Sequence, residues 1–150
     1  MTGYPDTSFL YAFYLKQSHS PAAAAYAATM KEPLHLTELL RYEFLQSLRF
    51  QVWRHAQDPG AGVVQADADA AINQLESDLQ NGIAVLATCN LMDTLRSANQ
   101  ISKRHTVTRG YRSFDILHVA TALHLQAKEF LTFDANQRKL AVAEGLKPKP

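Results

Sequence analysis

The sequence has 150 residues, of which 47% are hydrophobic, and a formal net charge of +1. We expect residues 1–150 to form a single domain that buries roughly two thirds of its unfolded surface. The near-neutral charge excludes a generally polyanion-binding chain, so any affinity for nucleic acid must come from a local patch. Cys89 is the only cysteine, which excludes an internal disulfide and a cysteine-rich zinc site.

The composition also favours one cellular location. A single cysteine suits a reducing compartment, and the N-terminus lacks the basic stretch and apolar core of a signal peptide. No apolar run approaches the ~20 residues needed to span a bilayer. We therefore expect a cytoplasmic protein with no membrane partner.

Apolar runs alternate with helical patterns in the first half of the chain. The pattern predicts a strand that ends before Asp6, helices over 8–16 and 22–30, a strand over 34–36, helices over 38–54 and 66–79, and a strand over 83–87. Ser20 and Thr37 are the expected N-caps of the second and third helices. Pro5 cannot donate a ladder hydrogen bond, so we expect the first strand to be short or distorted.

The second half of the chain repeats this alternation. The pattern predicts a helix over 91–102, a basic segment over 103–112, a helix over 114–126 capped by Ser113, a strand over 130–133, and a last helix capped by Asp134. Strands separated by helices are typical of an α/β fold with a central, mostly parallel sheet.

Four acids occupy positions where a lone charge is costly. Asp6, Glu43, Asp115 and Asp134 each lie where an apolar run gives way to a helix, or on the apolar side of a helix. Crowded carboxylates repel one another unless a cation lies among them, and a hard divalent metal ion meets that need. An all-oxygen ligand set favours Mg²⁺ or Mn²⁺. The leading hypothesis is therefore metal-dependent hydrolysis of a phosphodiester.

Each acid also has a simpler interpretation. Asp6 and Asp134 could cap the helices that follow them. Asp115 lies in a first helical turn, where the helix dipole favours any acid. Glu43 could be a surface residue paired with a neighbouring arginine. Taken singly, the acids are weak indicators of a metal site.

Polar neighbours of the acids are candidates for a supporting role. Ser8, Thr132 and Asn136 lie within two residues of Asp6 or Asp134, where they could orient a carboxylate or a metal-bound water, or simply contact solvent. His118 lies one turn after Asp115 and either approaches the site or is hydrogen-bonded within its helix.

The basic segment is the candidate for substrate contact. Four of the ten residues in 103–112 are Lys or Arg. Arg109, Arg112 and the adjacent Ser113 could hold the phosphates of a nucleic acid beside the acidic site, or the segment could be a solvated loop. Tyr14 and Tyr111 could stack on unpaired bases or pack in the interior.

Four motifs together resemble a known family. They are residues 6–10 (DTSFL), Thr37 with Glu43, residues 112–120 (RSFDILHVA), and residues 131–134 (LTFD). In this order, over about residues 4 to 146, they resemble the motifs of the PIN-domain nucleases. Within that family, the sequence resembles the VapC-like toxins of type II toxin–antitoxin pairs.

The resemblance implies a fold, a site and an activity. The fold is a three-layer α/β/α PIN-like domain, and the catalytic and metal-ligating acids are Asp6, Glu43, Asp115 and Asp134. The activity is Mg²⁺- or Mn²⁺-dependent endonucleolytic cleavage of RNA by a toxin that an antitoxin protein holds inactive. Two alternatives remain open: a PIN-domain RNA-processing nuclease without an antitoxin, and a non-catalytic nucleic-acid-binding module.

Aromatic residues of the first helices suggest a protein partner. Tyr11, Phe13, Tyr14, Tyr26 and Trp53 are numerous for the interior of one small domain. They predict either a docking surface, for a homodimer or an antitoxin helix, or an ordinary core.

Overall fold

The computed structural model describes all residues 1–150. The strands are β1 (Gly3–Pro5), β2 (Leu34–Leu36), β3 (Ala84–Leu86), β4 (Glu129–Leu131) and β5 (Lys147–Lys149). The helices are α1 (Thr7–Tyr14), α2 (Ser20–Ala27), α3 (Glu38–Gln57), α4 (Gln65–Gln80), α5 (Leu91–Arg109), α6 (Ser113–His124) and α7 (Ala135–Ala143).

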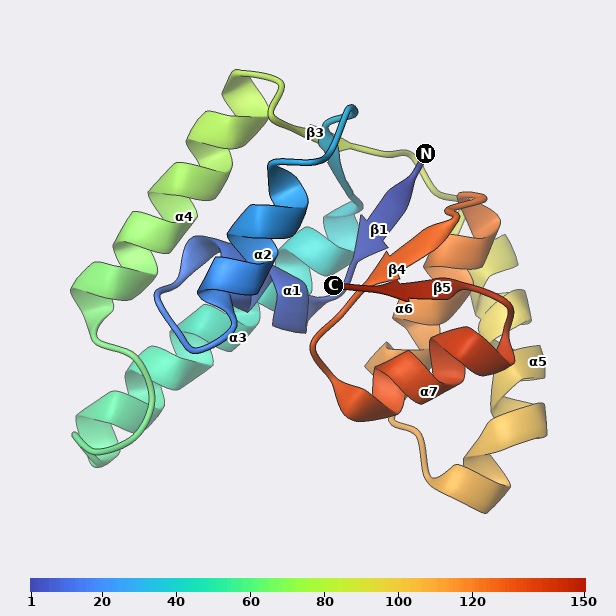
Figure 1. The fold of residues 1–150 in the computed structure, drawn as a ribbon. Helices are drawn as coiled ribbons and strands as arrows, with labels where there is room; N and C mark the ends of the chain where they lie inside the picture. The colour runs from blue at the N-terminus through green and yellow to red at the C-terminus, as the bar shows by residue number, and fades with distance from the viewer.

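The parallel strands form one layer, made of a three-stranded and a two-stranded sheet, between two groups of helices. Hydrogen bonds join the strands in the orders β1-β4-β5 and β2-β3, and β1 also lies beside β2. The strand order is therefore β3-β2-β1-β4-β5. Helices α1 to α4 contact one another on one side, whereas α5, α6 and α7 pack together on the other (Figure 1). The predicted three-layer α/β/α fold is confirmed.

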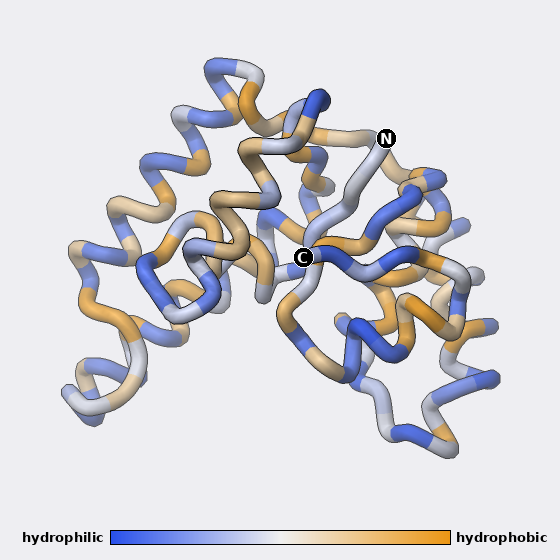
Figure 2. The backbone as a smooth tube through the Cα atoms, in the orientation of Figure 1, coloured by the Kyte–Doolittle hydropathy of each residue, from blue (hydrophilic) through white to orange (hydrophobic).

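One continuous core holds these layers together. Tyr4 and Phe130 face each other in register on β1 and β4, and both are fully buried. Leu36, Phe44 and Leu131 are also fully buried. Helix α4, by contrast, alternates between hydrophilic and hydrophobic residues along its length, as a helix with one apolar side does (Figure 2). Its buried side packs against α3.

Helix α5 is longer than the sequence predicted. It continues through most of the basic segment and ends at Arg109, where Gly110 takes a left-handed φ of 67° and donates its N–H to Thr106 O. The prediction of a helix ending near residue 102 was wrong, because Lys and Arg are good helix formers and Gly110 provides the stop.

Strand β5 was missed altogether. Its sequence, Lys-Pro-Lys, lacks the apolar residues that mark a strand, since it lies at an edge of the sheet with both lysines exposed. Pro148 is tolerated there because an edge strand needs fewer backbone donors. Pro5, in contrast, ends the short central strand β1, as the sequence indicated.

The helix caps were predicted with mixed success. Thr37 accepts a hydrogen bond from Leu40 N, as expected. Ser20 does not cap α2: it lies inside the helix, and its hydroxyl donates to Leu15 O. Ser113 is likewise the first residue of α6, and Arg112 occupies the N-cap position without a side-chain capping bond to a backbone N–H of the helix. Both serines are therefore shifted by one position from the predicted caps.

Most of the aromatic residues belong to the core. Tyr11, Phe13, Tyr14 and Tyr26 are partly buried and pack against it. Trp53 alone is largely exposed, and its ring stacks on exposed Phe50 with the centroids 5.4 Å apart. For four of the five residues, the core interpretation therefore holds.

Candidate active site

The four acids come from four separate segments that reach one edge of the sheet. Asp6 directly follows β1, and Asp134 lies three residues after the end of β4. Glu43 is in the second turn of α3, which follows β2, and Asp115 is in the first turn of α6. Because the strands are parallel, their carboxyl ends lie at the same edge, which is where ligands bind in open α/β sheets.

Asp6 is the most deeply buried of the four acids. Its side chain is inaccessible to solvent. Oδ1 accepts hydrogen bonds from Ser8 Oγ at 2.7 Å and from Phe9 N at 2.9 Å, and Oδ2 accepts one from Thr132 Oγ1. Burial raises the pKa of Asp6, although the bonds from Ser8 and Thr132 lower it in part. Asp6 is therefore both the N-cap of α1 and a buried acid of the site.

Thr132 connects Asp6 with Asp134. While its hydroxyl donates to Asp6, the same oxygen accepts the backbone N–H of Asp134 at 3.0 Å. Asp134 caps α7 by accepting the backbone N–H groups of Asn136 and Gln137 at 2.8 Å each. The side chain of Asn136 is exposed and makes no hydrogen bond to an acid. Ser8 and Thr132 thus touch the carboxylate of Asp6, whereas Asn136 contributes only its backbone.

Glu43 and His118 meet across the helix layers. Oε2 of Glu43 lies 2.5 Å from Nε2 of His118 and also accepts a hydrogen bond from Thr7. Desolvation disfavours the charge of Glu43, but the hydrogen bond and charge of His118, with the bond from Thr7, outweigh it and lower the pKa of Glu43. The surface ion pair with a neighbouring arginine, considered from the sequence, is not formed. Arg41 instead pairs with Glu38 and Glu76.

Asp115 is paired with the arginine that precedes its helix. Arg112 Nε lies 3.1 Å from Asp115 Oδ2, and Arg112 Nη2 lies 3.4 Å from Oδ1. The acid side chain is only 8% exposed, whereas that of the arginine is 77% exposed. The pKa of Arg112 is raised by the hydrogen bond and charge of Asp115, and further by the charges of Asp134 and Glu43. The guanidinium therefore lies within the field of three acids.

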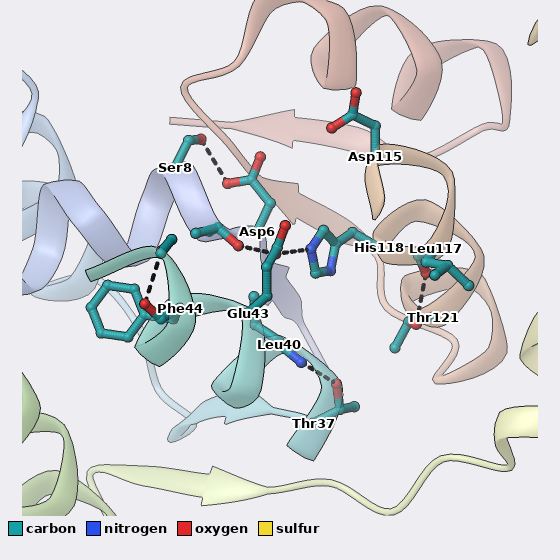
Figure 3. A network of polar contacts seen from close by, with 12 residues as sticks. Asp6, Ser8, Thr37, Leu40, Glu43, Phe44, Asp115, Leu117, His118 and Thr121 are labelled. Carbon is teal, nitrogen blue, oxygen red and sulfur yellow. Dashed lines mark hydrogen bonds and ion pairs between the residues drawn. The ribbon is translucent and has the colours of Figure 1, made fainter. Parts of the chain in front are cut away.

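The four acids thus share neighbours. Thr132 links Asp6 with Asp134, and Thr7, next to Asp6 in the chain, donates to Glu43. Figure 3 shows the side chains of Asp6, Glu43 and His118 beside one another, with Asp115 projecting from α6 towards the same region.

The chemistry of these donors fits a hard divalent cation. The side chains offer carboxylate oxygens, which Mg²⁺ and Mn²⁺ prefer, and Arg112 already lies where a positive charge is stabilised. In the arrangement observed, no three His, Cys, Asp or Glu side chains are grouped closely enough to hold an ion. A bound ion would therefore require rotation of the acid side chains, and Asp115 would have to share its carboxylate with Arg112 or release it.

The basic residues divide into two groups. Arg104 donates two hydrogen bonds to Glu144, at 3.2 and 2.7 Å, so it supports the packing of α5 near α7. Arg109 and Ser113 are exposed, and no side-chain hydrogen bond occupies them. Tyr111 is buried, and Tyr14 donates to Asp78 at 3.0 Å, so neither is free to stack on a base. Arg109 and Ser113 are therefore free to contact a ligand, whereas Arg112 is engaged by Asp115.

Sequence reasoning undervalued two residues of this site. Nothing in the local pattern distinguished Thr7 from an ordinary first-turn residue, and His118 was expected either to approach the site or to be hydrogen-bonded within its own helix. Its Nε2 contacts Glu43, while its Nδ1 is buried without a partner. The available signal was a histidine one turn after Asp115, on the same face of α6.

Comparison with known proteins agrees with this geometry. The family model described as PIN domain matches residues 3–143. No curated protein matches the chain significantly. The family match covers all four acids and nearly all of the chain.

None of the helices combines the length and apolar character needed to cross a membrane.

Proposed function

The chain belongs to the PIN-domain family, whose members are generally nucleases, and from this premise we propose that it is a metal-dependent endoribonuclease. The observation that carries the proposal is the arrangement around the four acids. Asp6, Glu43, Asp115 and Asp134 come from distant segments, reach one edge of the sheet and share neighbours. Structural acids are seldom collected in this way, because their mutual repulsion opposes folding.

The side chains have distinct tasks in the proposed reaction. Asp6, Glu43, Asp115 and Asp134 would hold one or two Mg²⁺ or Mn²⁺ ions. Such ions, when bound, supply a hydroxide at neutral pH and stabilise negative charge on the phosphate. Ser8 and Thr132 fix the rotamer of Asp6 through their hydroxyls. No side-chain nucleophile is required.

The proposed substrate is single-stranded or looped RNA. Arg109, Arg112 and Ser113 lie at the end of α5 and the start of α6, next to Asp115 in the chain. Exposed cations at this place would hold backbone phosphates near the acids without reading the base sequence. Such contacts position the RNA strand, and selection of the target RNA would depend on other parts of the protein surface.

We further propose a biological setting. The protein would act in the cytoplasm as the toxin of a toxin–antitoxin pair, as a homodimer held inactive by an antitoxin protein. The support is the resemblance of the four motifs to those of VapC-like toxins. An RNA-processing nuclease without an antitoxin is the second candidate. Growth arrest on expression, relieved by the product of a neighbouring reading frame, is expected only for the toxin.

A cleavage assay tests the central proposal. Purified protein is incubated with total RNA and Mg²⁺ or Mn²⁺, and the new RNA ends are sequenced. We expect defined endonucleolytic ends that vanish with a chelator and in Asp115→Asn, the matched inactive control. A single-stranded DNA of the same sequence tests the preference for RNA. Absence of metal-dependent cleavage of either nucleic acid would leave the non-catalytic binding module as the better description.

A further inference from the structure

The guanidinium of Arg112 holds an unusual place in the site. It forms a two-point contact with Asp115, one of the proposed metal ligands, and is the only Lys or Arg side chain hydrogen-bonded to any of the four acids. Arg138, which follows Asp134 on α7, is instead occupied by the carbonyls of Thr132 and Pro150. Arg112 is therefore the one exposed cation held by this acidic cluster.

An ordinary i,i+3 ion pair is the simpler explanation, but two features distinguish this contact. Exposed pairs join two solvated side chains, whereas here a buried carboxylate meets an arginine that is 77% exposed. The guanidinium of Arg112 can therefore move away from Asp115 without disturbing the core, whereas the buried carboxylate of Asp115 cannot move in this way. In addition, the charges of Asp134 and Glu43 act on the same guanidinium, although they belong to other segments.

We propose that Arg112 is a tethered counter-cation that holds Asp115 in the absence of metal, is displaced when a divalent ion takes Asp115, and then binds a phosphate of the RNA. The inference rests on the proposed function, since it assumes a metal site at the four acids. It adds a coupling: metal loading releases the arginine that the substrate needs.

Electrostatics favours the displacement. A guanidinium and a divalent ion on one small carboxylate repel each other, because both would lie within a few ångströms of the same oxygens. Asp115 is fixed in the first turn of α6 and nearly buried, so the arginine is the partner that can move. Its exposed side chain allows that movement.

The released guanidinium has an evident target. Arg112 stands at the N-cap position of α6, next to exposed Arg109 and Ser113 in the same stretch of chain. Its planar fork, which contacts both oxygens of a carboxylate, also suits two oxygens of a phosphate. Affinity for metal and affinity for RNA should therefore reinforce each other, since coupling between two sites is reciprocal.

NMR of the arginine side chain tests the displacement directly. The Nε–H signal of Arg112, assigned by its absence in Arg112→Lys, is followed in wild-type protein during titration with Mg²⁺ and without RNA. We expect the signal to move from a hydrogen-bonded position towards that of solvent-exposed arginines as the site fills. A signal that stays unchanged at saturating Mg²⁺ would overturn the inference.

Mn²⁺ affinity provides an independent measurement. By calorimetry, Arg112→Gln should bind Mn²⁺ about tenfold more tightly than wild type, because the competing cation is gone. Lys103→Gln is the matched control: it removes one exposed charge that makes no hydrogen bond to an acid, and its Mn²⁺ affinity should stay within about twofold of wild type. Equal affinities of Arg112→Gln and wild type would contradict the competition.

RNA binding completes the test. Stopped-flow anisotropy, read before cleavage begins, compares wild type with Arg112→Gln in chelator and in Mg²⁺. We expect the two proteins to bind RNA equally in chelator, and wild type to gain affinity with Mg²⁺ much more than the variant does. If wild type binds no Mn²⁺ at all, the proposed function fails; if it binds Mn²⁺ but Arg112 stays on Asp115, only this inference fails.

Discussion

His118 and Glu43 are 75 positions apart in the sequence, yet Nε2 of His118 lies 2.5 Å from Oε2 of Glu43. The histidine is only 1% exposed and the glutamate 25% exposed, so the contact is screened from water. It joins α6 to α3, the two helices that carry Asp115 and Glu43. The same hydrogen bond therefore stabilises the fold and fixes an acid of the proposed site.

Removal of His118 should weaken both roles. In His118→Ala, Glu43 keeps only its bond from Thr7, and a cavity forms beside Tyr4. We expect the free energy of unfolding in urea to fall by about 2 to 4 kcal/mol. The exposed side chain of His124 makes no hydrogen bond, so His124→Ala should change the free energy of unfolding by less than about 0.5 kcal/mol. Equal stability of the two variants would show that the contact is not stabilising.

Two substitutions of Asp6 can separate its role as a charged residue of the proposed site from its role as the N-cap of α1. In Asp6→Asn the amide oxygen can still accept from Ser8 and Phe9, and the hydroxyl of Thr132 can turn to accept from the amide. We expect cleavage to be lost while the free energy of unfolding changes by less than about 1.5 kcal/mol. Asp6→Ala, which also removes the cap, should be less stable than Asp6→Asn by about 1 kcal/mol. Activity retained in Asp6→Asn would exclude Asp6 as a catalytic acid.

Many local features of the fold could be predicted from the sequence, whereas individual tertiary contacts could not. The capping of α1 by Asp6 and of α7 by Asp134 depends on residues within one turn, so their spacing revealed it. Strand β5 exists only because β4 offers an edge, and no pattern in its own residues marks it. The contact between His118 and Glu43 likewise depends on how two helices pack, which neither helix encodes alone.

The ion cluster of Glu144 predicts a dependence of stability on pH. Desolvation disfavours the charge of Glu144, but hydrogen bonds and charges from Arg104 and His105 outweigh it and lower its pKa below the ordinary value of 4.5. A carboxyl with a lower pKa in the folded than in the unfolded protein stabilises the fold above pH 4.5, and that contribution is lost as the pH falls through the folded-state pKa.

Glu144→Gln isolates this contribution. Wild type should exceed the variant in free energy of unfolding near pH 6, by at most about 1 kcal/mol because Arg104 is half exposed, and the difference should shrink towards pH 3. Urea unfolding at several pH values measures it. Glu38→Gln, which removes a far more exposed acid, should show a smaller difference throughout. A difference in free energy of unfolding between wild type and Glu144→Gln that grows as the pH falls would contradict the stabilising role of ionised Glu144.

The exposed cations at the start of α6 should govern how RNA binding responds to salt. Each phosphate neutralised by a cation releases counterions, so the logarithm of the affinity falls with the logarithm of salt concentration by about 0.7 per contact for a single strand. In Mg²⁺, the double variant Arg109→Ala, Arg112→Ala should lose about two such contacts and flatten the slope by about 1.4.

Arg104 supplies the matched comparison, since its guanidinium is engaged by Glu144. Arg104→Ala removes an equal charge from the same basic segment, yet it should change the slope much less than either Arg109→Ala or Arg112→Ala does. Anisotropy titrations over a range of salt concentrations, read before cleavage, give all of these slopes. If the double variant keeps the wild-type slope while Arg104→Ala flattens it, RNA crosses the outer surface of α5 near α7, and its path to Asp115 must be sought from that side.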